Sequence, residues 1–303
     1  MREVIFVLLP EVEILDFAGP LQALEDANRD RKRYRIRVCA TRSSIRTHQG
    51  VELAGLDRLP DDVGAESIVV VPGMPYAATQ RVERAITRWL ANAAKAGAHV
   101  TSVCTGAFIL GEAGLLDGRR CTTHWSRTSE LQRRFPQARV LVDRLFVSDG
   151  NITTSAGIAS GIDMALALIE QHDGPLVAAE VAREMVVYMR RDGAHEQRSV
   201  YLDYRTHIHP CIHRVQDWIV QNPRQRATIG ELAEVAGMSP RNLTRTFRGA
   251  TGISIHDFVT RVRLELAQAL VHDPSLTLDA VAQRCGFANA RALRRLGVHR
   301  SAS

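Results

Sequence analysis

One segment near the C-terminus, TIGELAEVAGMSPRNLTRTFRGATG, constrains the fold most, because the ends of two consecutive helices can be located in it. Thr228 and Glu231 form a capping box that begins the first helix. Gly237 supplies the left-handed residue that ends it. Ser239 can cap a second helix, and Pro240 suits the first position of that helix. The segment therefore predicts two short helices joined by a three-residue turn.

Apolar residues give each of these helices a buried face. In the first helix they recur at the i, i+3, i+4, i+7 spacing of one face, and they are Ile229, Leu232, Ala233 and Ala236. In the second helix, Leu243 and Phe247 are expected to pack back on the first. This arrangement is a helix-turn-helix, the geometry that fills a DNA major groove.

The opposite face of the second helix has the chemistry to read DNA. Arginine can donate two hydrogen bonds to guanine, and the threonine methyl group can contact thymine. We expect Arg241, Thr244 and Arg245 to approach base edges, while Asn242 and Arg248 hold phosphates or sugar. The alternative is an ordinary helical hairpin whose charged face is only solvated.

The same pattern recurs 49 residues later. Thr277 occupies the capping position, and the apolar and glycine positions are filled by Leu278, Val281, Ala282, Cys285 and Gly286. Asn289 can cap the following helix, where Leu293 matches Leu243, and the exposed positions hold Arg291, Arg294 and Arg295. A chance hairpin does not share caps, turn and arginines at one offset, so we predict two helix-turn-helix units. Joined by the long helix expected at 253–272, they can enter two major grooves about 34 Å apart.

The first two thirds of the chain has a different pattern. Short β-branched or apolar runs lie at 2–9, 34–40, 67–72 and 98–103 and alternate with helix-like segments near 18–29 and 79–96. Such alternation predicts an α/β fold, a three-layer flavodoxin-like sandwich with a largely parallel sheet. Residues 139–144 and 145–156 suggest an antiparallel excursion with an Asp149-Gly150 turn, followed by helices at 158–171 and 176–191.

Charge and composition fit two domains of different kind. Residues 1–191 hold 24 Lys+Arg against 23 Asp+Glu, whereas residues 192–303 hold 15 against 10, so the positive excess lies with the helix-turn-helix units. Only two residues of the chain are lysine, so genomic base composition is an alternative source of its arginine richness. We expect a domain at 1–191, a linker at 192–206 and an all-α DNA-binding domain at 207–303.

Cysteine usage and hydropathy indicate the compartment. The five cysteines form no C-x-x-C pair, so neither a disulfide framework nor a zinc site is predicted. No run is long and apolar enough to span a bilayer, and the N-terminus has the pattern of a strand rather than a signal peptide. We therefore expect a cytoplasmic protein.

The double unit resembles the DNA-binding domain of the AraC/XylS transcription regulators over residues 207–303. The resemblance rests on AGMSPRNLTRTFRGATGIS, on RLELAQALV and on VAQRCGF. The C-terminus departs from the family pattern, because Arg294 and Arg295 run directly into LGVHRSAS. The position that matches Phe247 is Gly297, so the second recognition helix is expected to be short.

Cys104 lies where the run AHVTSV meets the helix-like TGAFILGEAG. A cysteine at such a strand-to-helix corner faces the positive end of the helix dipole. Its thiol is therefore expected to have a lowered pKa and to be a better nucleophile. The alternative is a small buried core residue, as most free cysteines are.

The surroundings of Cys104 resemble the PfpI and isonitrile-hydratase-like branch of the class I glutamine amidotransferase-like superfamily. The resemblance covers roughly residues 1–190 and rests on LDFAGP, VVVPG and VCTGAFILGEAGLLDGRRCTTHW. It implies Cys104 as the elbow nucleophile, Asp16 as the carboxylate beside it and Thr105 as a neighbouring donor. It implies Gly73 in an anion-binding backbone and His124 near the cysteine, although a purely structural histidine is the alternative for His124.

The combination resembles the amidase-like AraC regulators, in which this domain serves as a sensor or assembly module. We therefore expect a sequence-specific transcription regulator, with double-stranded DNA, a small-molecule effector and a second copy as partners and with no cofactor. His207, His209 and His213 are expected on one helix, where His209 and His213 have roughly metal-like i, i+4 spacing but lack a carboxylate motif, so no metal is expected. The competing hypothesis is a Cys104-dependent hydratase, amidase or deglycase acting on small carbon-nitrogen or carbonyl compounds.

Overall fold

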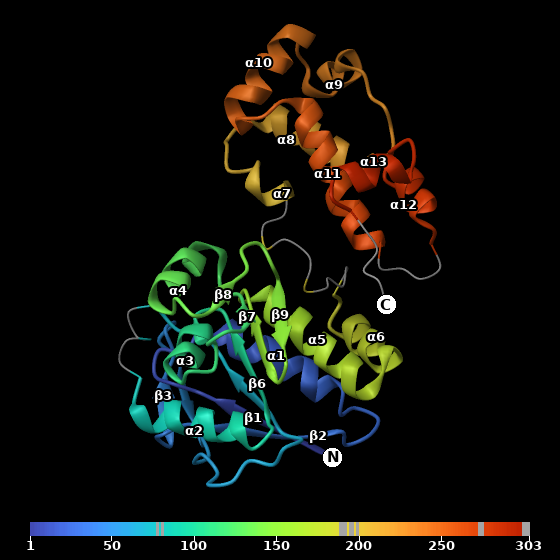
Figure 1. Cartoon of the computed structure of the whole chain (residues 1–303). Coiled ribbons are helices and arrows are strands. Elements are labelled where there is room, and N and C mark those ends of the chain that lie inside the picture. Colours follow the sequence, from blue (N-terminus) through green and yellow to red (C-terminus); the bar gives the residue numbers. More distant parts are fainter. Residues whose placement is uncertain are drawn as a thin grey trace. The chain divides into compact units, whose positions relative to one another are not determined.

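The structure is a computed structural model, and it describes residues 1–76, 79, 82–187, 193, 197, 200–271 and 276–298. The chain divides into two compact units, Met1–Gln197 and Arg198–Ser303, called the α/β unit and the helical unit below (Figure 1). Of the expected linker at 192–206, only residues 193, 197 and 200–206 are described. The helix expected at 176–191 ends earlier, at Glu184, because Val186 takes a positive φ of 54°; residues 188–191 lie outside the described residues.

A six-stranded sheet forms the centre of the α/β unit. Its strands are β1 (Arg2–Val7), β2 (Tyr34–Cys39), β5 (Ile68–Val71), β6 (His99–Val103), β9 (Phe146–Asp149) and β10 (Ile152–Ser155). They are ordered β2-β1-β5-β6-β10-β9, and all pairs are parallel except β10 with β9. The strands expected near residues 2–9, 34–40, 67–72 and 98–103 are confirmed.

Helices cover both faces of this sheet (Figure 1). One layer contains α1 (Ile14–Asp26), α5 (Ala159–Asp173) and α6 (Pro175–Glu184), and the other contains α2 (Arg84–Lys95), α3 (Gly106–Glu112) and α4 (Thr128–Arg134). Alternate residues of β1 point to opposite faces of the sheet. Val4 and Phe6 pack in the core on the side of α1, α5 and α6, and Ile5 and Val7 pack in the core on the side of α2, α3 and α4. This is the expected three-layer α/β sandwich.

The segment 139–156 pairs differently from the prediction. The hairpin lies wholly within its second half. Asp149 still pairs with Ile152, so the turn is Gly150-Asn151, one residue later than predicted, and Gly150 has φ 61°. The first half forms β8 (Arg139–Val140), which pairs in parallel with β7 (Arg120–Cys121), so the expected antiparallel partner was wrong. The sequence analysis also missed a small hairpin of β3 (Ser44–Arg46) and β4 (Glu52–Ala54).

The helical unit contains two hydrophobic cores joined by one long helix. Its helices are α7 (Val200–Asp203), α8 (Pro210–Gln221), α9 (Ile229–Ala236), α10 (Pro240–Thr251), α11 (Ile255–Leu270), α12 (Leu278–Arg284) and α13 (Ala290–Arg295). The first core is built by α8, α9, α10 and the start of α11, and the second by the end of α11 with α12 and α13. Each core therefore supports one helix-turn-helix.

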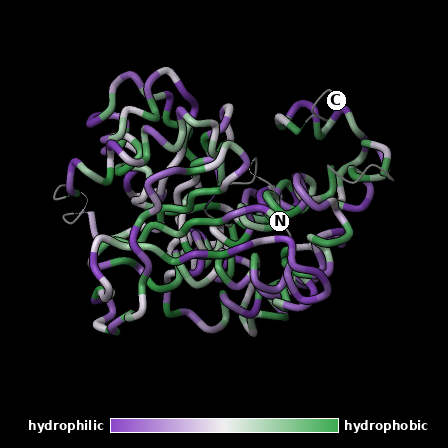
Figure 2. Tube along the Cα trace, turned by 90° about the horizontal axis from the view of Figure 1, so that it is seen from below, coloured by the Kyte–Doolittle hydropathy of each residue, from purple (hydrophilic) through white to green (hydrophobic). Residues whose placement is uncertain are grey.

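Hydrophobic and hydrophilic stretches alternate along the coloured part of the trace (Figure 2). None of the helices in the described part of the chain is long and apolar enough to cross a membrane.

Candidate functional site

The first helix-turn-helix forms with the caps that its sequence predicts. The Thr228 hydroxyl accepts from the Glu231 N–H at 3.2 Å, and the Glu231 carboxylate accepts from the Thr228 N–H at 2.7 Å. Gly237 ends α9 in the left-handed conformation, with φ 69°. The Ser239 hydroxyl caps α10, and Pro240 is its first residue. These predictions are confirmed, because each depends only on local backbone geometry.

Helix α10 presents a basic outer face. Leu243 and Phe247 are fully buried, whereas Arg241, Thr244, Arg245 and Arg248 are exposed. Among the residues that the structure describes, none forms an ion pair with these arginines. The Asn242 side-chain oxygen accepts from Arg245 Nη2 at 3.0 Å and so orients that guanidinium. The base and phosphate contacts assigned to this face stay predictions.

The second helix-turn-helix is the smaller of the two. Thr277 and Asn289 cap its helices as predicted, with side-chain oxygens accepting from the N–H groups of Ala280 and Ala292. Helix α13 has 6 residues against 12 in α10, so the expected shortening is confirmed. After it, Gly297 has φ 85°. The buried residues Leu293 and Val298 complete the core, and Arg291, Arg294 and Arg295 are exposed.

In the α/β unit, Cys104 occupies the corner between β6 and α3. Its backbone has φ 55°, a left-handed conformation that costs a non-glycine residue about 1–3 kcal/mol. The Cys104 N–H donates to the Ser155 carbonyl at 2.9 Å, which holds the corner against β10. Gly157 approaches closely, since an added Cβ there would lie 3.0 Å from the Cys104 Sγ. The strained elbow that the sequence predicts is therefore present.

Asp16 reaches the same corner from α1. Its side chain is 0% exposed, and Oδ1 accepts from the Ile158 N–H at the start of α5, at 2.7 Å. Gly73 lies between the functional groups, because an added Cβ would collide with Asp16 Oδ2 and lie 2.9 Å from the Cys104 Cβ. The structure thus brings Asp16, Gly73, Cys104 and Thr105 together, as the resemblance implied. Their chemical roles stay predictions.

The protonation of this pair differs from the expectation. Burial raises the pKa of Asp16 to about 6, partly opposed by the Ile158 N–H. Burial, followed by the Asp16 charge, also raises the pKa of the Cys104 thiol well above its ordinary value. The predicted lowering of this pKa was wrong, because burial and a neighbouring carboxylate outweigh the favourable N–H of Thr105. The corner therefore holds a protonated thiol beside a carboxyl group whose pKa is about 6.

The neighbouring residues hold the corner in place. The Thr105 hydroxyl bonds to the backbone of Met74, accepting from its N–H at 2.9 Å and donating to its carbonyl. The Thr123 hydroxyl donates to the Cys104 carbonyl at 2.7 Å. His124 instead caps a short turn and contacts Ser126, and burial lowers its pKa. No described hydrogen bond joins His124 to the Cys104 side chain, so its pocket role stays a prediction.

Three contributors to this site were not predicted from the sequence. Ile158 contributes its backbone N–H to Asp16, and Thr123 contributes a hydroxyl that donates to the Cys104 carbonyl. Neither contact has a recognisable sequence motif. Gln197 was also missed. Its amide donates to the Thr123 carbonyl at 2.9 Å and to the Thr122 hydroxyl at 3.2 Å. The last described residue of the α/β unit is therefore bonded to the loop that supports Cys104.

The three histidines before and within α8 gather without forming a recognisable metal site. The rings of His207 and His213 lie 4.5 Å apart, and those of His207 and His209 lie 5.8 Å apart. Burial, followed by His213, lowers the pKa of His207. Across the described ranges, no group of three or more His, Cys, Asp or Glu residues is arranged to hold a metal ion.

Both units match known families. Residues 2–171 match the DJ-1/PfpI family, and residues 232–298 match a helix-turn-helix domain. The HTH-type transcriptional regulator CdhR of Pseudomonas aeruginosa is 29% identical over 93% of this chain and 84% of its own. The regulator GlxA of Rhizobium meliloti is 26% identical over 94% and 88%. The isonitrile hydratase of Pseudomonas putida is 32% identical, but over only 55% of this chain and 70% of its own.

Solved structures agree on the fold of the α/β unit. An AraC family transcriptional regulator from Pseudomonas putida superposes with a TM-score of 0.55 and 24% identity, covering 61% of this chain and 100% of that one. Drosophila melanogaster DJ-1beta superposes with a TM-score of 0.53 and 20% identity, covering 61% of this chain and 97% of that one.

This chain joins a thiol-bearing α/β unit to two helix-turn-helix units, and HTH-type transcriptional regulators match 93–94% of its length. This places the protein in the class of DNA-binding regulators rather than enzymes. The chain belongs to the DJ-1/PfpI family.

Proposed function

We propose that this protein selects sites on duplex DNA and regulates transcription there in response to a small ligand bound at Asp16 and Cys104. The observation that carries the proposal is the outer face of α10, where exposed arginines lie on a helix whose two ends are fixed by Ser239 and Gly252. Arginines without carboxylate partners remain available for phosphates and guanine edges. The full-length regulators that resemble the chain support the same function.

The two recognition helices have unequal parts in this proposal. Arg241, Thr244 and Arg245 contact base edges, while Asn242 and Arg248 hold the backbone. Helix α13 follows the next groove with fewer contacts, because it is half as long. Its contacts come from Asn289, Arg291, Arg294 and Arg295. We assign residues 1–191 to the sensor and 207–303 to the DNA-binding domain, with the linker at 192–206. Within that linker, Val200 of α7 and the adjacent Tyr204 pack with the helical unit, and Gln197 belongs to the α/β unit.

The Asp16 and Cys104 site suits binding better than turnover. A cysteine nucleophile reacts as its thiolate, and both burial and Asp16 oppose thiolate formation at Cys104. A carboxyl group with a pKa of about 6 can accept a hydrogen bond from a small polar ligand or transfer a proton to it. The hydrogen bonds of Gln197 to the loop behind Cys104 offer a route from the pocket to the linker.

We also propose that the protein is a cytoplasmic homodimer that associates through its α/β unit. Two copies would place four helix-turn-helix units on one operator and lengthen the sequence that is read. Light scattering coupled to size exclusion tests the dimer, and a monomeric mass at micromolar concentration, about 34 kDa per chain, would contradict it.

The main test is selection of genomic fragments by the purified full chain. We expect a small set of related fragments to be enriched, with affinity that falls steeply as salt rises. Arg245→Ala should lower the affinity for the preferred fragment about tenfold or more, since a bidentate base contact contributes about 1–3 kcal/mol. The affinity for bulk DNA should change far less. Arg88→Ala, which removes an exposed arginine from α2, is the matched control and should change neither. Equal weakening on all sequences would refute base reading by Arg245.

A second candidate function rests on the 32% identity to the isonitrile hydratase. It requires turnover of isonitriles, amides or glyoxals that disappears in Cys104→Ala. A regulator without turnover predicts instead that the same variant changes ligand response and leaves DNA selection intact.

A further inference from the structure

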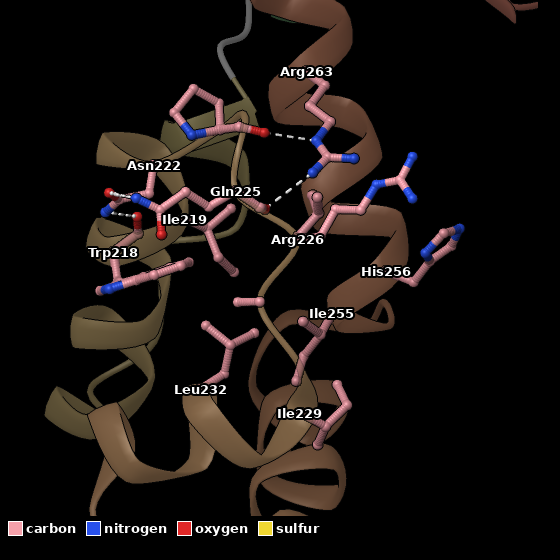
Figure 3. Close-up of a pocket in the computed structure, with 13 residues that line it drawn as sticks. Trp218, Ile219, Asn222, Gln225, Arg226, Ile229, Leu232, Ile255, His256 and Arg263 are labelled. Carbon is pink, nitrogen blue, oxygen red and sulfur yellow. Dashed lines mark hydrogen bonds between the residues drawn. The ribbon is translucent and has the colours of Figure 1, made fainter. Parts of the chain in front are cut away.

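The helical unit contains a pocket of about 390 Å³ that neither the helix-turn-helix function nor the Cys104 site uses. It lies between the end of α8, the start of α9, the first half of α11 and the connecting segment 222–227. Its apolar surface comes from Trp218 and Ile219 on α8, Leu232 on α9, and Ile255 and Val259 on α11 (Figure 3). This volume and lining suit a small organic molecule.

Positive charge accompanies this apolar surface. Arg226 and Arg263 supply this charge, and none of the thirteen residues that line the pocket is acidic. The Arg263 Nε donates to the Pro223 carbonyl at 2.7 Å and Nη2 donates to the Gln225 carbonyl at 3.1 Å (Figure 3). Burial and the charge of Arg226 lower the pKa of Arg263, so the two cations repel each other without a compensating carboxylate. An anion placed between them would relieve that repulsion.

Ile229 indicates that the apolar part is open to a ligand. The sequence pattern assigns Ile229 to the buried face of α9, but its side chain is 40% exposed and lines the pocket, so that prediction was wrong. The reason is its position directly after the Thr228 cap, where no preceding helical turn covers it. An apolar ligand body would remove this surface from water.

We propose that this pocket binds a small organic anion with an apolar body, of the arylalkyl carboxylate class. The carboxylate lies between Arg226 and Arg263, and the apolar body packs on Ile219, Leu232 and Ile255. This site is separate from the Asp16 and Cys104 pocket, and its occupancy does not depend on DNA.

The pocket lies where a bound ligand can affect both helix-turn-helix units. Arg263 holds segment 222–227 by donating to two of its carbonyls. The same segment contacts the second helix-turn-helix, where Arg224 Nε donates to the Arg284 carbonyl at 2.7 Å. Gly286 packs there so closely that an added Cβ would lie 2.9 Å from Arg263 Nε. A bound anion on Arg263 therefore acts at the junction between the two DNA-binding units.

The test is titration of the full chain, without DNA, by calorimetry and by Trp218 fluorescence in a Trp89→Phe, Trp125→Phe background. The probe is 4-phenylbutyrate, and 4-phenylbutanol is its uncharged control. We expect saturable binding of the acid, with the alcohol about tenfold weaker or more, since it lacks the charge-assisted contacts. Arg226→Gln should reduce affinity for the acid about tenfold, and Val259→Trp should abolish binding by filling the pocket.

Two controls place the binding in this pocket. Arg261→Gln removes one charge from the same helix, at a residue whose guanidinium lies over Tyr204 rather than in the pocket, and should leave the affinity unchanged. Asp16→Asn should also leave it unchanged. Absence of saturable binding at millimolar acid, equal affinity for acid and alcohol, or an unaltered affinity in Arg226→Gln would each overturn the proposal.

Discussion

Replacing Asp16 by Asn should remove a specific part of the pH dependence of stability. In the folded chain the pKa of Asp16 is about 6, against an ordinary value of 3.8, chiefly because the carboxylate is buried. Between these two values the folded state holds a proton that the unfolded state has released. The free energy of unfolding therefore falls as pH rises through this window and levels off above it. The amide of Asn keeps an acceptor for the Ile158 N–H but does not titrate.

The size of the effect follows from the two pKa values. Each pH unit between them corresponds to 1.36 kcal/mol, so the full window amounts to about 3 kcal/mol. The free energy of unfolding of the variant differs from that of the wild type by a constant amount, due to altered packing, and by this pH-dependent amount. From pH 4 to pH 7.5 the stability of Asp16→Asn relative to wild type should therefore rise by about 2.4 kcal/mol, because part of the window lies below pH 4.

The assay is urea unfolding in a Trp218→Phe background, in which the fluorescence of Trp89 and Trp125 reports the α/β unit alone. Asp117→Asn, which neutralises an exposed aspartate, is the matched control and should run parallel to the wild type at every pH. If Asp16→Asn also ran parallel from pH 4 to pH 7.5, the raised pKa of Asp16 would be wrong. The proposal that Asp16 and Cys104 form a ligand site with a titrating carboxyl group would then be wrong as well.

Three further predictions concern packing and caps. Gly73→Ala should destabilise the α/β unit by about 1–3 kcal/mol, because its Cβ would collide with Asp16 and Cys104; an unchanged urea midpoint would show that the corner has room. Thr228→Ala removes a capping box and should lower the free energy of unfolding of the helical unit by about 1 kcal/mol. Urea unfolding monitored by Trp218 fluorescence measures this loss, and Thr228→Ser should restore the stability. Gln197→Ala should cost the α/β unit about 1–2 kcal/mol through two lost hydrogen bonds, and an equal loss in the Trp218 transition would contradict its assignment to that unit.

Local signals explain why the helical unit could be predicted in detail. The cap at Thr228, the left-handed Gly237 and the Asn289 cap each depend on residues within one or two helical turns. The same reasoning failed for Ile229, because this residue directly follows the Thr228 cap, has no preceding helical turn over it, and borders the pocket between α8 and α11. A helical period locates a face, but it does not tell whether a neighbouring element covers every residue on it.

The Cys104 site could be predicted in its members but not in its chemistry. Strand and helix patterns place Cys104 at a corner, and the carboxyl ends of parallel strands bring Asp16 and Gly73 to the same edge. The protonation state depends on burial and on the Ile158 N–H, 142 residues away from Asp16. No sequence spacing carries that information, and the dipole argument alone gave the wrong sign for the thiol.

The most direct test of the central claim is the ratio of two affinities of the full chain at about 150 mM salt. One is for a fragment enriched from the genome, and the other is for a scrambled duplex of the same length and composition. Site selection by the two helix-turn-helix units predicts a ratio of about 10³ or more, reduced toward the level of the scrambled duplex in Arg241→Ala, Arg245→Ala. A ratio near one, with unchanged affinities in that double variant, would contradict the account.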